Sequence, residues 1–274
     1  MTRATNIACF GPAFALLALT AGADETDTEV VNKSNNPLNP AIVVNVQDYY
    51  IPSIEGAPGL QANAGILRAL TPFQLGDQVH LMRSTLPVVG APAADGGIDS
   101  GVGDLLVFDI LMKQEKGFAW GAGPLVVFPT AESRKYGAQR WQLGGAGGFA
   151  APRDWGLFGT LATYQNSVGG GGTRPDVSTL TVQPFLFYNL PDNFYLQSAG
   201  AWTFDFENDT HYMPIGLGLG RHWQVSRLVS FNTFIEPQYV VSNRGAGTPD
   251  WQLFAGINFQ YSLADVIARR RAGH

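Results

Sequence analysis

The segment from Trp251 to Leu263 alternates between two kinds of side chain, and this alternation constrains the fold more than any other feature. Its odd-numbered positions are almost all large and apolar, whereas its even-numbered positions are mostly polar or glycine. Successive side chains of a β-strand point to opposite faces, so we expect a strand with one apolar and one polar face. About a dozen similar segments recur along the chain. Strands of this kind are typical of a wall between lipid and a watery lumen.

The same alternation predicts about twelve strands, an even number that suits an up-and-down antiparallel transmembrane β-barrel. Most are about 10 to 13 residues long, the length that a tilted strand needs to cross the hydrocarbon, whereas soluble strands average about 5 to 6. The predicted fold class is therefore all-β. The strands lie near 40–50, 61–71, 78–89, 102–113, 118–129, 140–150, 156–166, 179–190, 194–206, 211–225, 229–242 and 251–263.

The connections fall into two classes. Short turns follow the even-numbered strands, near 72–77, 114–117, 151–154, 191–193 and 226–228. Longer links follow most odd-numbered strands, near 51–60, 90–101, 130–139, 166–178 and 243–250, and only the link around Asn208 and Asp209 is short. Outer-membrane barrels have short periplasmic turns and longer outer loops. We therefore expect the short turns and both termini in the periplasm.

The N-terminus has the pattern of a secretory signal. Arg3 precedes an apolar stretch from Ile7 to Leu19, and Ala21-Gly22-Ala23 forms a cleavage site. The apolar stretch is shorter than the roughly 20 residues that a spanning helix needs. The single cysteine, Cys9, lies in this segment, so the mature chain would lack disulfides and thiolate metal sites. The expected organisation is a signal peptide over 1–23, a periplasmic segment over 24–37, the barrel over 38–263 and a basic periplasmic tail over 264–274.

The composition argues against several classes of protein. Charged residues make up 14% of the chain, against about 25% in typical soluble domains. The net charge is −5 and the only basic run is 269–271, so nucleic acid is not an expected partner. No later run of 18 apolar residues occurs, which argues against a helical membrane protein. Together with a secretory signal, the pattern predicts the outer membrane of a Gram-negative bacterium.

Several segments carry a family resemblance. Residues 100–104 read SGVGD, 120–131 read WGAGPLVVFPTA, and 140–148 read RWQLGGAGG; later, 181–209 and 249–261 continue the likeness. In this order, over roughly residues 35–263, they resemble the meta-pathway phenol-degradation family of outer-membrane channels. The resemblance implies an outer-membrane barrel related to transporters of hydrophobic compounds, with mostly unassigned substrates and no catalytic residues. Barrel assembly machinery reads a terminal aromatic residue in such proteins; here Phe259 or Tyr261 would serve internally.

No catalytic or metal-binding constellation is expected. The histidines after the signal are His80, His211, His222 and His274, and neither a nucleophile motif nor a partner at metal-ligand spacing accompanies them. The glycine run 169–172 lacks the GK[ST] sequence of a phosphate-binding loop. We therefore expect no enzyme activity, cofactor or metal. A barrel lipid hydrolase, which needs a Ser, a His and an orienting Asn or acid at its rim, is the least favoured alternative.

Polar side chains on the inward face of the strands are the candidate solute contacts, beside an aromatic surface of Phe185, Phe187, Phe234 and Phe254. The candidate lumen residues are Arg68, Asp109, Asn232, Glu236, Gln238, Asn258 and Gln260. The competing interpretation is that they only fill the interior by hydrogen bonding to one another. A carboxylate inside a strand is costly unless it is hydrated or paired. Glu236 is therefore expected either to line a watery path or to pair with Arg68.

The predicted function is a monomeric outer-membrane channel for passive uptake of small hydrophobic or aromatic molecules. Its expected partners are the lipid bilayer, the solute and the barrel assembly machinery. The alternative is a plugged structural or adhesive barrel, although the modest outer loops disfavour adhesion to large ligands.

Overall fold

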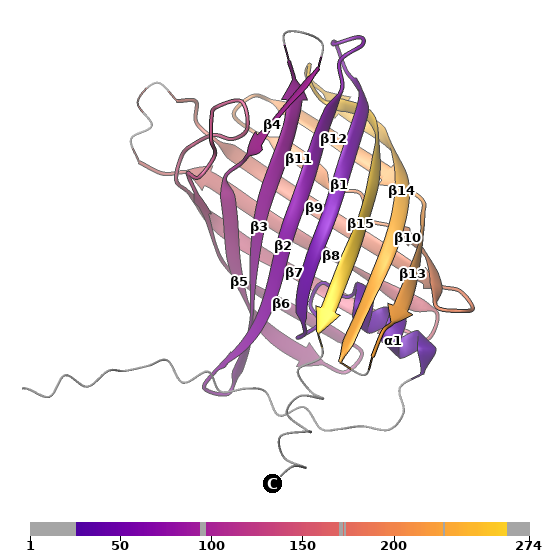
Figure 1. The fold of residues 1–274 in the computed structure, drawn as a ribbon. Helices are drawn as coiled ribbons and strands as arrows, with labels where there is room; N and C mark the ends of the chain where they lie inside the picture. Colours follow the sequence, from indigo (N-terminus) through magenta and orange to yellow (C-terminus); the bar gives the residue numbers. More distant parts are fainter. Residues whose placement is uncertain (1–25, 94–96, 170–171, 173, 227, 262–274) are drawn as a thin grey trace, which may run out of the picture.

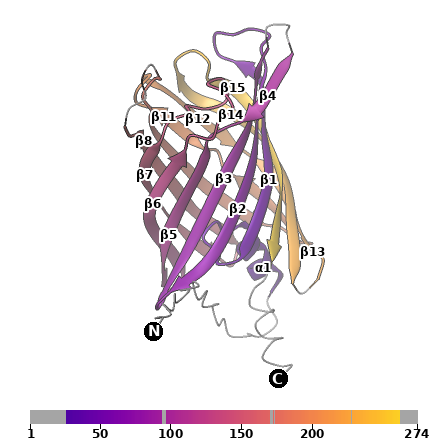
Figure 2. The same ribbon diagram turned by 60° about the vertical axis from the view of Figure 1, so that its left-hand side comes forward.

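A computed structural model describes residues 26–93, 97–169, 172, 174–226 and 228–261, and its strands close into a barrel (Figures 1 and 2). The expected signal peptide, 1–23, and the expected basic tail, 264–274, lie outside the described residues. The described residues form one helix, α1 (Asp27–Asn35), and one 15-stranded sheet. The strands are β1 (Ile42–Ile54), β2 (Ala62–Leu75), β3 (Gln78–Pro92), β4 (Ile98–Val102), β5 (Leu105–Glu115), β6 (Phe118–Phe128), β7 (Gln142–Arg153), β8 (Gly156–Ser167), β9 (Ser178–Asn189), β10 (Phe194–Ser198), β11 (Trp202–Asp205), β12 (Thr210–Gly216), β13 (Gly218–Gln224), β14 (Val229–Arg244) and β15 (Pro249–Tyr261).

The fifteen strands form a wall of twelve strands. Three pairs of neighbouring segments, β4 with β5, β10 with β11 and β12 with β13, each count as one strand with an interruption. β4 and β5 both pair with β3, β10 and β11 both pair with β9, and β12 and β13 both pair with β14. Every pairing is antiparallel, and β1 closes the circle against β15 with Asn45 opposite Asn258. The predicted twelve-stranded up-and-down barrel is therefore confirmed.

The two ends of the barrel differ in their connections. At the short-turn end, the links are 76–77, 116–117, 154–155, 190–193 and 225–228; one of them places Gly117 at φ +86°, in the left-handed region that favours glycine. At the long-loop end, the links are 55–61, 93–97, 129–141, 168–177, 206–209 and 245–248. The predicted loop over 243–250 is wrong in extent. β14 continues to Arg244 and β15 begins at Pro249, so this link is a tight turn.

The outward face of the wall is apolar and uncovered. Leu217 is 66% exposed, Ile235 50% and Ile257 40%. The residues on either side of each point inward and are buried or half-buried, as alternation along a strand requires. Aromatic side chains mark both ends of this face: Trp155, Tyr188 and Trp223 at the short-turn end, and Trp141, Tyr164 and Trp251 at the long-loop end. An apolar band between two aromatic girdles is the exterior of a barrel embedded in lipid.

Helix α1 lies in the mouth of the barrel at the short-turn end (Figures 1 and 2). It begins with a capping box, in which the Thr26 hydroxyl accepts from the backbone N–H of Glu29 and the Glu29 carboxylate accepts from that of Thr26. Val31 and Leu38 join the buried apolar cluster of the interior. The buried face of α1, with Val31, Asn32 and Ser34, therefore packs into the barrel, while Asp27, Glu29 and Lys33 are exposed. None of the described residues forms a helix long and apolar enough to span a membrane.

Candidate functional site

The inner wall of the barrel has two different sides. On β14, β15 and β1, the inward positions carry mainly amides, including Asn45, Asn232 and Gln252. On β5, β6 and β8 they carry mainly apolar side chains, including Phe108, Leu125 and Leu161. Every second side chain of a strand points into the lumen, so the inward residues of each strand determine whether that part of the wall is polar or apolar. The lumen therefore presents a polar track opposite an apolar wall.

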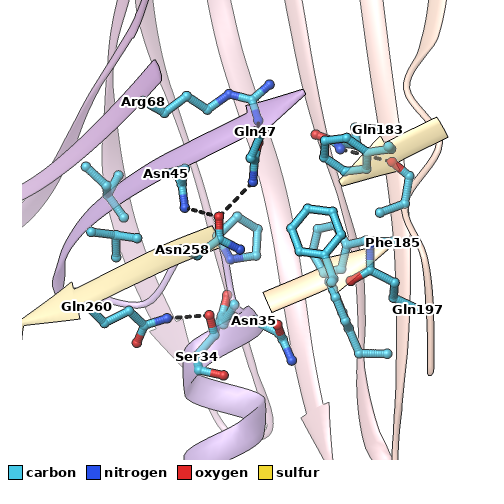
Figure 3. Close-up of a pocket in the computed structure, with 18 of the residues that line it drawn as sticks. Ser34, Asn35, Asn45, Gln47, Arg68, Gln183, Phe185, Gln197, Asn258 and Gln260 are labelled. Atoms are coloured by element: carbon cyan, nitrogen blue, oxygen red, sulfur yellow. Dashed lines mark hydrogen bonds between the residues drawn. The ribbon is translucent and has the colours of Figure 1, made fainter. Parts of the chain in front are cut away.

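A cavity with a volume of about 120 Å³ lies in the lumen next to α1. Figure 3 shows Arg68 at one side of it and the end of α1, with Ser34 and Asn35, at the other. The polar lining residues are Ser34, Asn35, Asn36, Asn45, Gln47, Arg68, Arg83, Gln183, Gln197, Asn258 and Gln260. The apolar lining residues are Pro37, Val43, Leu70, Phe185, Phe187, Ala199, Phe234 and Phe254. Polar and apolar side chains thus share one site, which is lined by α1 and by strands β1, β2, β3, β9, β10, β14 and β15, while β5, β6 and β8 contribute none of its lining residues.

An amide network holds the polar lining in place, with Asn258 at its centre. The Asn258 Oδ1 atom accepts from Asn45 Nδ2 at 2.6 Å and from Gln47 Nε2 at 2.8 Å. Asn258 Nδ2 in turn donates to Asn232 Oδ1 at 2.7 Å. Arg68 donates from Nη1 to the side-chain Oε1 atom of Gln47. These hydrogen bonds between side chains hold the polar lining in one arrangement.

Two arginines face the cavity from neighbouring strands. Arg68 on β2 stands opposite Thr85 on β3, and Arg83 lies two residues before Thr85. Such diagonal neighbours on one face are about 7–8 Å apart. The Arg83 guanidinium lies 5.5 Å from the centre of the Phe108 ring. Within the described part of the chain, the buried Nε atoms of both arginines have no hydrogen-bond partner, and no carboxylate lines the cavity.

Aromatic rings form the apolar part of the lining. Phe254 stacks on Tyr49 with 4.2 Å between ring centres, and Phe234 meets Phe254 edge-on at 4.8 Å. Across the cavity, Phe185 and Phe187 lie 6.0 Å apart. Interlocked rings lose little conformational freedom when a planar solute contacts them. These four phenylalanines are the aromatic surface that the sequence predicted.

Helix α1 forms the floor of the cavity and is held by side-chain amides of the wall. Asn32 donates to the Arg153 carbonyl at 2.9 Å and accepts from Asn189 at 2.9 Å. On the opposite side, Asn232 donates to the Ser34 carbonyl at 3.2 Å, and Gln260 donates to the same oxygen. These hydrogen bonds reach β7 and β9 on one side and β14 and β15 on the other, so α1 crosses the mouth of the barrel.

The structure contradicts both expectations for Glu236. Its side chain points inward and is fully buried, but it neither lines the cavity nor pairs with Arg68. Its carboxylate accepts from Gln197 Nε2 at 2.7 Å, from the backbone N–H of Ala199 at 2.9 Å and from Gln238 Nε2 at 3.0 Å. Ala199 lies in the interruption between β10 and β11. The carboxylate therefore satisfies a backbone donor that the broken strand leaves free.

The other predicted lumen residues separate into three groups. Arg68, Asn258 and Gln260 line the cavity. Asn232 and Gln238 face inward but are buried beneath the lining, at 0% and 1% exposure. Asp109 was wrongly predicted to face the lumen. It stands opposite the outward Met82, between the buried Phe108 and Ile110, and therefore lies on the outer face.

Asp109 has a partner that makes an outward carboxylate tolerable. Its Oδ2 atom lies 2.7 Å from His80 Nδ1, and the His80 ring stacks on Phe73. His80 is the third residue of β3, close to the short-turn end, where the pair is near the membrane surface. The polar lining residues that sequence reasoning missed are Ser34, Asn35 and Asn36 at the end of α1, together with Asn45, Gln47, Arg83, Gln183 and Gln197. Arg83 shares the inward face of β3 with the buried Leu81, and this shared face is the signal that could have placed it in the lumen.

No group of three or more metal-ligating side chains occurs in the described part of the chain. Of its histidines, His211 lies 3.2 Å from the Ser242 hydroxyl, and His222 lies 3.3 Å from Gln224. Neither contact includes the acid that orients a catalytic histidine.

Neither protein-family models nor curated proteins match the chain. Solved outer-membrane barrels do resemble it. The COG4313 outer membrane channel from Pseudomonas putida F1 superposes with a TM-score of 0.61 at 15% identity, over 82% of this chain and 99% of that one. The NanC porin gives a TM-score of 0.49 at 13% identity, over 81% and 100% of the two chains. The KdgM porin gives 0.42 at 10% identity, over 81% and 99%. Identities this low establish the barrel fold alone, so the family resemblance stays a prediction.

Proposed function

We propose that the protein is a monomeric outer-membrane channel for passive passage of small molecules with both an apolar and a polar side. The observation that carries this proposal is the mixed lining of the lumen cavity, in which Arg68 and the amides of Asn258 and Gln260 lie beside phenylalanine rings. Channels select by the width and the lining of their pores. A lining of this kind suits hydrophobic or aromatic solutes that carry one polar group.

The apolar exterior and the fold shared with an outer-membrane channel support the membrane location. We assign the short-turn end to the periplasm, because short turns lie on that side in such barrels. Helix α1 would then occupy the periplasmic mouth. In this proposal α1 narrows the exit, and passage requires it to shift or to leave a gap beside it.

A plugged structural barrel is the second candidate, and α1 is the observation that favours it. The helix buries Val31 and is held from both sides by Asn32 and Asn232. If these contacts never break, the cavity is a dead end. A hydrolase is disfavoured because His211 and Ser242 lack an orienting acid within the described residues, and we propose that no chemical step takes place.

The test is conductance and solute flux of the purified protein in planar bilayers and vesicles, with empty vesicles as the control. Discrete current steps and flux that exceeds that of empty vesicles support the channel. Absence of both from correctly folded protein, judged by its circular dichroism, favours the plugged barrel.

A further inference from the structure

We propose that the lumen cavity is a binding site for a small aromatic carboxylate, meaning a single ring that bears one carboxyl group. This inference rests on the proposed channel function and names the class of solute that the channel would carry. It is argued from the charges of the lining, from its rings and from its size.

The charged residues that line the cavity are all positive. Arg68 and Arg83 both contribute guanidinium groups, and no lining residue is acidic. Among the described residues, Glu236 is the one buried carboxylate of the lumen; it is already bound by Gln197, Gln238 and Ala199 and does not reach the cavity. Two neighbouring guanidinium groups without a counter-charge repel each other and favour an anion. The site therefore lacks a negative charge that a ligand can supply.

The geometry of the arginines favours a carboxylate as this anion. A guanidinium presents its N–H groups in a planar fork that matches the two oxygens of a carboxylate. Arg68 uses one Nη atom to hold Gln47, while its Nε is buried and without a partner among the described residues. Arg83 likewise has a buried Nε without a hydrogen bond. Because both arginines line the cavity, a carboxylate placed between them would accept from the guanidinium N–H groups that border it rather than from the buried Nε atoms.

The rest of the lining fits one aromatic ring. Phe185, Phe187, Phe234 and Phe254 border the same cavity as the arginines. Its volume of about 120 Å³ is close to the roughly 150 Å³ of an apolar cavity that holds one benzene molecule. An inorganic anion would leave these rings uncovered, whereas a neutral hydrocarbon would leave the arginines unsatisfied. A ring with a carboxylate meets both requirements.

Calorimetric titration of the detergent-solubilised full chain tests the site directly, with benzoate as the probe. Benzamide removes the charge, and acetate removes the ring. Benzoate is expected to bind at least about tenfold more tightly than either, because a hydrogen-bonded charge or a buried ring each contributes at that scale. Arg68→Gln and Arg83→Gln should each weaken benzoate binding about tenfold. Arg83→Lys, which keeps the charge, should lose less.

The matched control is Arg244→Gln, which removes the same charge from an arginine that is 63% exposed and pairs with Asp209 at the long-loop end. It should bind benzoate as the wild type does. Phe185→Leu should weaken benzoate binding without changing that of acetate. Circular dichroism of each variant shows whether the barrel is folded, and the pair Arg83→Lys and Phe185→Leu tests the site even if a glutamine variant fails to fold.

Equal affinity for benzoate and benzamide, or benzoate binding that survives in both glutamine variants, would overturn the proposal. Conductance in KCl separates this outcome from failure of the channel. A protein that conducts but does not prefer benzoate is a channel without the carboxylate site. A protein that binds benzoate through its arginines but never conducts keeps the site and loses the channel.

Discussion

Replacement of Glu236 should act on the stability of the barrel rather than on its ion selectivity. The carboxylate is fully buried and accepts three hydrogen bonds, from Gln197, Ala199 and Gln238. Each buried donor left without an acceptor costs about 1–3 kcal/mol. Gln197 and Gln238 can rearrange but the Ala199 amide cannot, so Glu236→Ala leaves one buried donor unsatisfied, at about 1–3 kcal/mol. The truncated side chain also leaves a cavity that costs about 2 kcal/mol, so we expect the free energy of unfolding to fall by about 3–5 kcal/mol.

The isosteric change Glu236→Gln gives a sharper result. It keeps one carbonyl acceptor but turns an NH₂ group toward the remaining donors, so we expect a loss of about 1.5–3 kcal/mol. Gln183→Met is the matched control, because it removes one hydrogen bond, from Gln183 to the Ala199 carbonyl, and should cost about 1 kcal/mol. The assay is equilibrium unfolding by urea in lipid vesicles, with reversal potentials measured in parallel. Unchanged stability of Glu236→Gln with an altered reversal potential would refute this structural role.

Three further predictions concern the wall and its orientation. Ile257→Arg, on the outward face, should cost about 2–4 kcal/mol in a folding titration into bilayers, whereas Gln183→Arg, on the inward face, should cost about 1 kcal/mol; equal penalties would contradict the strand register. A cysteine at Gly169 should be labelled by an impermeant reagent on intact cells and one at Asp192 should not; the reverse pattern would invert the orientation. Gly218→Ala would place a Cβ 2.6 Å from the Glu236 Cβ, so it should lower the free energy of unfolding in urea by about 1–3 kcal/mol; an unchanged free energy of unfolding would show that β13 can shift.

The barrel was predictable because its environment repeats. Every strand lies between lipid and lumen, so the alternation in 251–263 recurs around the wall and sets strand number and pairing order. Faces were harder to predict where both are apolar. In β5, Phe108 and Ile110 point inward and Asp109 outward, but the neighbouring leucines and valine hide the contrast. Arg83 was obscured in the same way, since its inward neighbour Leu81 is as apolar as the outward Met82.

The site depended on contacts that no strand pattern contains. Thr26 and Glu29 form a capping box that signals a helix, yet nothing in that signal indicates that the helix enters the barrel. Its position depends on amides such as Asn32 and Asn189, which are 157 residues apart. The role of Glu236 depends on the interruption at Ala199, which interrupts an otherwise continuous alternation. Long-range partners of this kind become visible only when the barrel is closed.

The central claim is that the lumen conducts and that α1 sets the width of its mouth. Planar-bilayer conductance of the wild type and of Val31→Asp tests both parts, because Val31 is 2% exposed and a buried aspartate should dislodge the helix. Val30→Asp, at the half-buried neighbouring position, is the control. We expect current steps from the wild type, larger steps from Val31→Asp and wild-type steps from Val30→Asp. Folded protein that carries no current in any of the three forms would contradict it.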